Sequence, residues 1–276
     1  MSTALPVSDN PAEAVADELV AARLAARPLA RFPGVLPADL AEAYRCQDAV
    51  IARWPTPVAG WKVGYIAPER REPQGDPRLV GPIFAGNIRP LDGAEGEFAV
   101  IAGGFAAVEA EFMFRLARDI PAQVHDWTPE EAAREVAALH VGIELAGSPL
   151  ADINVLGPCA VVADCGNNAG LLLGPAIANW QDVAMDDLRC STWIDGQLAG
   201  RGGAATLAGG PLAALAFALS RNARCGRTMR AGEWITTGAA TGIHDIVAGQ
   251  HAVVDFGAYG RLRCRAVPAR AHGGGA

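Results

Sequence analysis

Ala107-Val108-Glu109-Ala110-Glu111-Phe112-Met113-Phe114 is an apolar run that carries two acidic residues, with one residue between them. Its aromatic, β-branched and long apolar residues predict a strand. Side chains at positions i and i+2 of a strand point to the same face, about 7 Å apart, so Glu109 and Glu111 should project together. Two ordinary acids on a wet strand face are the simpler interpretation of this segment alone. The alternative is a hard divalent cation, Mg²⁺ or Mn²⁺, between two buried carboxylates that would otherwise repel each other.

The composition limits the partners that the chain can have. Its 276 residues suffice for one large domain, or for a small domain joined to a larger one. Apolar residues make up 51% and aromatic residues 6%, so Ala, Val, Leu and Ile must fill most of the core. A net charge of −7 without a Lys/Arg cluster argues against nucleic acid and against an anionic membrane surface as partners. An acidic protein that binds a small carboxylate needs local positive charge, from a metal or from one placed Lys.

The cysteines and the termini indicate a soluble cytoplasmic protein. No basic region followed by an apolar stretch begins the chain, so no signal peptide is expected. No apolar run reaches the roughly 18 residues that suggest a transmembrane helix. The cysteines are scattered without a Cys-x-x-Cys pair, which favours reduced thiols over a disulfide framework or a zinc site; they are Cys46, Cys159, Cys165, Cys190, Cys225 and Cys264.

Two helices are predicted before residue 58. Asn10-Pro11 with an early acid predicts a helix that continues to about residue 26. Pro37-Ala38-Asp39 predicts the start of a second helix, which ends near Trp54-Pro55. We therefore expect residues 1–57 to form a helical N-terminal subdomain.

From Val58 onward the pattern is mostly that of strands, with helical periodicity at 129–139 and 211–224. Many strands with few helices between them do not fit a regularly alternating parallel sheet. The predicted fold class is α+β, with a β-rich core over residues 58–267 and a mobile tail over 268–276. The predicted strands are 58–66, 98–101, 107–116, 141–145, 160–163, 171–173, 190–194, 251–256 and 261–266.

Two further charged residues are embedded in apolar runs. Glu144 lies within 139–147 and Lys62 within 58–66. A single buried Glu is usually paired with Arg or hydrogen-bonded, whereas three such acids favour one shared cation. A buried Lys either pairs with a carboxylate or has a lowered pKa suited to proton transfer, and a structural ion pair is an equal alternative for Lys62.

Two Gly-containing turns can present amide groups to a bound anion. They are 164–170, Asp-Cys-Gly-Asn-Asn-Ala-Gly, expected between two strands, and 236–242, Thr-Thr-Gly-Ala-Ala-Thr-Gly. Ordinary connecting turns are the simpler interpretation of both. The chain contains no Gly-x-Ser-x-Gly elbow and no Gly-x-x-x-x-Gly-Lys-Ser/Thr phosphate loop. Its five His are dispersed, which makes a His-based zinc site an unfavoured interpretation.

Several short motifs, each weak alone, share a specific order over about residues 12–266. They are Gly60-Trp61-Lys62-Val63-Gly64, Val108-Glu109-Ala110-Glu111, Glu144, the turn from Asp164 to Gly170, Ala231-Gly232-Glu233-Trp234-Ile235-Thr236-Thr237-Gly238, and Val254-Asp255-Phe256-Gly257. In this order and spacing the chain resembles the 2-keto-4-pentenoate hydratases and the related 4-oxalocrotonate decarboxylases of the fumarylacetoacetate hydrolase superfamily.

The resemblance implies a helical N-terminal part before a β-rich core of the fumarylacetoacetate hydrolase type. It implies Mg²⁺ or Mn²⁺ bound by Glu109, Glu111 and Glu144, with the 2-oxo and carboxylate oxygens of the substrate completing the coordination. The metal would act as a Lewis acid that stabilises an enolate. The residues that the resemblance implies in catalysis are Lys62, Asp164 and Asn167, and those in substrate binding are Lys62, Asn168, Thr241 and His244.

The implied enzyme is a lyase that hydrates a 2-oxo-4-enoate to a 4-hydroxy-2-oxo acid, as a homo-oligomer in aromatic catabolism. Decarboxylation of a 4-oxalocrotonate-like acid is the second interpretation. Hydrolysis of a C–C bond in an acylpyruvate is a third, for which His244 is the candidate base. A non-catalytic protein that binds 2-oxo acids is an alternative of a different class.

Three positions depart from the family pattern. Leu79-Val80 stands where relatives commonly have an Asp before the glycine that matches Gly81. Asn167 replaces a Ser in the first turn, and Ala239 replaces one in the Gly-Ser-x-Thr pattern of the second. These changes favour retained metal–enolate chemistry with an altered substrate or an altered proton path.

Overall fold

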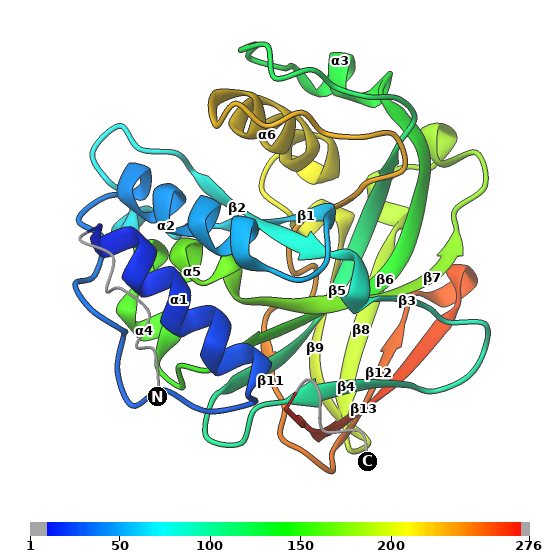
Figure 1. The fold of residues 1–276 in the computed structure, drawn as a ribbon. Helices are drawn as coiled ribbons and strands as arrows, with labels where there is room; N and C mark the ends of the chain where they lie inside the picture. The colour runs from blue at the N-terminus through cyan, green and yellow to red at the C-terminus, as the bar shows by residue number, and fades with distance from the viewer. Residues whose placement is uncertain (1–9, 272–276) are drawn as a thin grey trace.

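Two β-sheets and a group of helices make up the computed structural model, which describes residues 10–271 (Figure 1). Residues 1–9 and the end of the predicted tail, 272–276, lie outside this range. The start of that tail belongs to a sheet, because Pro268 ends the last strand and the N–H of Ala269 donates to the carbonyl of Val100 at 2.8 Å. Among the described helices, none combines the length and the apolar character that crossing a membrane requires.

Helices α1 (Pro11–Leu24) and α2 (Leu40–Arg53) form the two predicted helices, and each begins at a side-chain cap. The side chain of Asn10 accepts a hydrogen bond from the N–H of Ala12, and that of Asp39 accepts one from Glu42. Such caps satisfy N–H groups that the first helical turn leaves without a partner. With α4 (Ile153–Leu156) and α5 (Pro158–Ala163), the two helices gather at one side of the larger sheet and share one apolar cluster (Figure 1).

The larger sheet is mainly antiparallel and holds eight of the described strands. Its two longest strands, β5 and β6, pair over most of their length, with Glu109 directly opposite Glu144. Strand β11 (His244–Asp245) pairs with β5 beside the main path. The main path runs β2 (Arg78–Phe84), β1 (Val58–Tyr65), β10 (Trp234–Thr236), β5 (Phe105–Leu116), β6 (Val136–Ser148), β7 (Asn168–Ala176) and β3 (Ile88–Pro90).

The second sheet covers one face of the first. Phe112 of β5 meets Phe256, which follows β12, with ring centroids 5.7 Å apart. Both rings belong to one large core cluster built mostly from Ala, Val, Leu and Ile, as the composition requires. The strands of this sheet are β4 (Gly96–Val100), β13 (Arg261–Pro268), β12 (His251–Asp255), β8 (Arg189–Ile194) and β9 (Gln197–Gly203).

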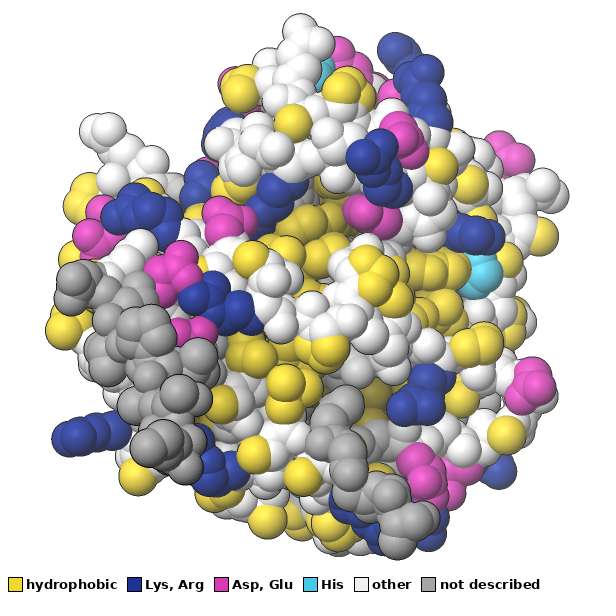
Figure 2. Space-filling view, viewed as in Figure 1, with side chains coloured by type: hydrophobic (Ala, Val, Ile, Leu, Met, Phe, Trp, Pro, Cys, Tyr) yellow, Lys and Arg dark blue, Asp and Glu magenta, His cyan; other side chains and the backbone are white. Residues whose placement is uncertain are grey.

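Helices α3 (Pro129–Ala133) and α6 (Gly210–Arg224) lie together at another side of the larger sheet (Figure 1). Figure 2 shows Lys/Arg and Asp/Glu side chains interspersed over the visible face, with apolar side chains between them.

Two sequence predictions of secondary structure are wrong. Residues 160–163 form part of helix α5 and not a strand, because a run of four apolar residues fits either element and Pro158 lies in the first turn of the helix. The predicted helix over 129–139 ends at Ala133, and β6 begins at Val136. The capping box of Thr128 and Glu131 does start a helix, but Leu139 and Val141 are buried at alternate positions of a strand.

Candidate metal and substrate site

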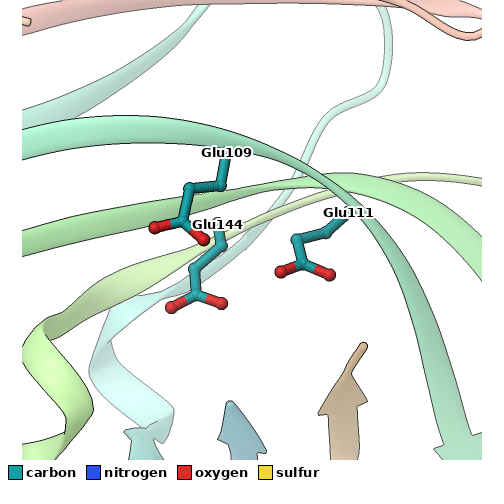
Figure 3. Close-up of side chains that lie close together, drawn as sticks. All are labelled: Glu109, Glu111 and Glu144. Carbon is teal, nitrogen blue, oxygen red and sulfur yellow. The ribbon is translucent and has the colours of Figure 1, made fainter. Parts of the chain in front are cut away.

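Three buried glutamates meet where β5 and β6 pair. Glu109 and Glu111 share a face of β5, and the strand register brings Glu144 of β6 opposite Glu109. One carboxylate oxygen from each lies within 4.8 Å of the others (Figure 3). Because Glu109 is 3% exposed and the other two are 0% exposed, the interpretation as a wet strand face is wrong.

The neighbouring groups hold two of the carboxylates in fixed positions. Glu111 accepts hydrogen bonds from the backbone N–H of Thr237 at 2.9 Å and of Gly238 at 2.9 and 3.1 Å. Glu144 accepts one from the hydroxyl of Thr236 at 3.0 Å and one from the side-chain amide of Asn168 at 3.2 Å. The turn over 236–242 therefore helps to hold two of the glutamates in place. Its sequence alone did not distinguish this role from that of an ordinary connecting turn.

Lys62 is the positive group of the site and the only lysine in the chain. Its Nζ lies 3.1 Å from Glu144 Oε1 and donates to Oδ1 of Asn167 at 3.4 Å. Burial lowers the pKa of Lys62, but attraction to Glu144 and to Glu109 outweighs it, so the pKa is raised. Lys62 is therefore an ammonium group paired with Glu144, and its role in proton transfer stays a prediction.

One ammonium group does not balance three buried carboxylates. Burial raises the pKa of Glu109 to about 7 although Lys62 opposes the rise, and Glu144 adds to it by repulsion. Burial, and then repulsion by Glu144 and by Glu109, raise the pKa of Glu111 well above its ordinary value. A cluster of oxygen ligands that lacks positive charge suits a hard divalent cation, so these residues fit Mg²⁺ or Mn²⁺.

The turn after α5 brings two amides to this site, through a strained backbone. Cys165, Gly166 and Asn167 have φ angles of +57°, +67° and +51°. Such angles cost roughly 1–2 kcal/mol for a residue that carries a Cβ. A Cβ on Gly166 would lie 2.7 Å from Cδ of Lys62, so glycine is needed there for space as well as for φ. The turn joins a helix to β7, not two strands as expected.

Asp164 begins this turn, and Arg23 and Ser148 hold its carboxylate. Its Oδ1 accepts from Nε of Arg23 at 2.7 Å and its Oδ2 from the hydroxyl of Ser148 at 2.6 Å. Arg23 also donates to the carbonyls of Gly147 at 2.8 Å, Asn168 at 3.2 Å and Asp164 at 3.2 Å. This buried pair anchors the turn to helix α1, and no sequence pattern pointed to Arg23.

A pocket of about 820 Å³ opens beside the site. Lys62, Glu109 and Asn167, all buried, line its inner end, together with residues 237–239. Further along, the walls are mainly apolar, from Ile66, Leu79, Val161, Leu207 and Ile243. A volume and lining of this kind suit a small organic ligand.

The predicted site residues thus fall into three groups, of which Asp164, held by Arg23 and Ser148, is the first. Lys62, Asn167 and Asn168 lie with the three glutamates, as the contacts above describe. Thr241 and His244 contact each other at 3.1 Å, and Thr241 also contacts Thr192 of β8 at 2.8 Å. Neither residue belongs to the lining of this pocket. Their role in substrate binding therefore stays a prediction without a supporting contact.

Comparison with known proteins supports the resemblance. No model of a known protein family matches the chain. A 2-keto-4-pentenoate hydratase of Burkholderia vietnamiensis (strain G4 / LMG 22486) is 28% identical over 183 residues, which are 66% of this chain and 68% of that protein.

The solved structures confirm the predicted fold. 4-Oxalocrotonate decarboxylase from Pseudomonas putida G7, complexed with magnesium and adipate, gives a TM-score of 0.79 at 18% identity, over 96% of this chain and 100% of that one. Its complex with calcium and acetate gives 0.78 with the same identity and coverage. Fumarylpyruvate hydrolase from Pseudomonas aeruginosa, with Mn²⁺ and pyruvate, gives 0.56 at 19% identity, over 78% of this chain and 91% of that one.

Proposed function

We propose that the chain is a metal-dependent lyase that hydrates a 2-oxo-4-enoate, supplied as its 2-hydroxydienoate tautomer, to a 4-hydroxy-2-oxo acid. The observation that carries this proposal is the cluster of Glu109, Glu111 and Glu144 beside Lys62 at the inner end of a pocket. The similarity to a 2-keto-4-pentenoate hydratase supports the same reaction.

The three glutamates would hold Mg²⁺ or Mn²⁺. When bound, the ion supplies Lewis-acid stabilisation of negative charge on the 2-oxo group as the enolate forms. The N–H groups of Thr237 and Gly238 and the hydroxyl of Thr236 keep Glu111 and Glu144 oriented toward one point.

Lys62 and Asn167 act next to the metal ligands. As an ammonium group at neutral pH, Lys62 binds the substrate carboxylate or donates a proton, with Asn167 fixing the direction of Nζ. The net reaction adds a hydroxyl at C4 and a hydrogen at C5 of the substrate, so a positioned proton donor is required. Asp164, predicted in catalysis, is reassigned in this proposal to positioning, because Arg23 and Ser148 occupy its carboxylate.

Decarboxylation of a 4-oxalocrotonate-like acid is the second candidate. The decarboxylase structures span 96% of this chain, whereas the fumarylpyruvate hydrolase spans 78%. Loss of CO₂ and hydration both pass through a stabilised enolate, so one site serves either reaction. Acylpyruvate hydrolysis has less support, because His244, its candidate base, does not line the pocket.

The test is turnover of 2-hydroxypenta-2,4-dienoate by the purified protein with Mg²⁺ or Mn²⁺, followed by ultraviolet absorbance and product identification. Formation of 4-hydroxy-2-oxopentanoate supports hydration. Release of CO₂ from 4-oxalocrotonate without hydration of the dienoate would replace it by the second candidate. Metal-dependent binding of oxalate or pyruvate without turnover of either substrate would contradict both and favour a non-catalytic binder.

Four finer expectations complete the proposal. They are a homo-oligomeric state, a cytoplasmic location, a role in aromatic catabolism, and the division of the chain into a helical N-terminal subdomain (1–57), a β-rich core (58–267) and a tail (268–276). Light scattering of the purified protein tests the first. Limited proteolysis tests the division, since a separate N-terminal subdomain predicts cleavage close to residue 57.

A further inference from the structure

Two arginines line the pocket without an acidic partner. Arg70 donates to the backbone carbonyl of Asn154, and Arg78, the first residue of β2, donates to that of Ala208. Over residues 10–271, neither guanidinium forms an ion pair with Asp or Glu. Carbonyl groups orient a guanidinium but leave its charge without a counter-ion, so both arginines can accept an anion from the pocket.

Both arginines lie beyond the catalytic end of the pocket. In the pairing of β1 with β2, Lys62 is opposite Gly81 and Tyr65 is opposite Arg78. Arg78 therefore starts three residues along the strand from Lys62, about 10 Å away. Arg70 lies in the segment that follows this end of β1, and Asn154 separates it from the catalytic end: the carbonyl of Asn154 accepts from Arg70, and its Oδ1 accepts from the side-chain amide of Asn167 at 3.2 Å.

The pocket thus has two polar ends and an apolar middle. Leu79, which is buried and pairs with Gly64, lies between Lys62 and Arg78 in the strand register. The two acidic side chains of the lining are Glu109, at the metal end, and Asp245 of β11, which pairs with β5 and not with β2. Burial lowers the pKa of Arg78, so water solvates its charge incompletely and a bound carboxylate would compensate it.

We propose that Arg70 and Arg78 form a second anion-binding subsite, which selects 2-oxo acids with a carboxylate at the far end of the chain. The subsite rests on the proposed function, because the metal end must hold the 2-oxo acid head group for the far end to reach the arginines. The preferred substrates are then dicarboxylic 2-oxo enoates, in place of those whose far end is an uncharged carbon.

Calorimetric titration of two ligands with Mg²⁺ present tests the subsite. 2-Oxoadipate and 2-oxohexanoate share the head group and the six-carbon chain, and only the first has a distal carboxylate. We expect the protein to bind 2-oxoadipate at least tenfold more tightly. Arg78→Gln and Arg70→Gln should each weaken 2-oxoadipate binding by about ten- to a hundredfold and leave 2-oxohexanoate binding unchanged.

Arg71→Gln is the matched control. Arg71 lies in the same loop but stacks over Tyr65 and donates to the carbonyl of Ile66, outside the pocket lining. Equal affinity for the two acids, or an equal loss for both in the Arg70 and Arg78 variants, would overturn the subsite and leave the proposed function intact. If neither acid binds in a metal-dependent way, the proposed function fails and the subsite with it.

Discussion

Arg23 of helix α1 donates a hydrogen bond of 2.7 Å to Asp164, the residue that begins the turn carrying Asn167 and Asn168. Both side chains of this pair are at least nine-tenths buried, with 10% and 1% exposure. The N-terminal helix therefore contributes to the position of the amides that contact Lys62 and Glu144, although it contributes no residue to the pocket lining.

Arg23→Gln should destabilise the protein by about 3–5 kcal/mol, because it leaves the carboxylate of Asp164 buried without a charge partner. Urea denaturation measures this loss. Arg27→Gln is the control, because it breaks an exposed ion pair with Glu18 of helix α1. The expected cost is about 1 kcal/mol or less. Equal losses in the two variants would contradict a structural role for the buried pair.

Gly166→Ala should displace Lys62, since the new Cβ would lie 2.7 Å from its Cδ. Gly226→Ala is a close control, because Gly226 has nearly the same φ, +69° against +67°, and no atom within 4 Å of its added Cβ. Backbone strain is then common to both variants, and only the first should lose turnover.

Selective ¹³C labelling of lysine reports directly on the Lys62 side chain in these two glycine variants, because Lys62 is the only lysine. We expect its side-chain signal to shift in Gly166→Ala and to stay in place in Gly226→Ala. An unmoved signal in both would show that the turn does not determine the position of Lys62.

Lys62→Gln should reduce turnover by about 10²–10⁴-fold, the usual contribution of a positioned proton-transfer group. Metal affinity should be unchanged or higher, because the substitution removes a positive charge 3.1 Å from the ligand Glu144. Turnover assays and Mn²⁺ titration of the same preparations separate the two effects. A parallel loss of metal binding and turnover would reduce Lys62 to a structural ion pair.

Glu233 should make stability depend on pH. Its buried carboxyl accepts from Nε1 of Trp61 at 3.1 Å, and burial raises its pKa from 4.5 to about 7. The folded state binds this proton more tightly than the unfolded state, so the stabilisation is present at low pH and is lost as pH rises through about 7.

The comparison with Glu233→Gln isolates this effect. Between pH 4.5 and 8, the unfolding free energy of the wild type should fall by about 1–3 kcal/mol relative to that of the variant. The exposed residue Glu130, replaced by Gln, serves as control and should follow the wild type. Parallel pH profiles for the wild type and Glu233→Gln would contradict the raised pKa.

The charged residues of the site could be predicted because each interrupts an apolar run. Glu109, Glu111, Glu144 and Lys62 all lie on strands whose burial the sequence pattern indicates. Lys62 is the single lysine among the 23 Lys and Arg residues. Because a compact ammonium group is not equivalent to a guanidinium, its place in an apolar run distinguished it from the arginines.

Contacts between segments far apart in the chain could not be predicted in the same way. Arg23 is 141 positions from Asp164, and on its own helix it has the character of an ordinary surface arginine. Arg70 ends a short 3-10 helix and Arg78 begins strand β2, positions where arginine is unremarkable until the pocket is seen. The misassigned segments, 160–163 and 134–139, are short apolar stretches whose periodicity fits a helix or a strand.

Titration of the metal-depleted protein with Mn²⁺ shows whether Glu109, Glu111 and Glu144 hold one divalent cation. We expect one site per chain, with affinity reduced more than about tenfold by Glu109→Gln, Glu111→Gln or Glu144→Gln and unchanged by Glu130→Gln. Unchanged stoichiometry and affinity in the three cluster variants would contradict a shared metal site.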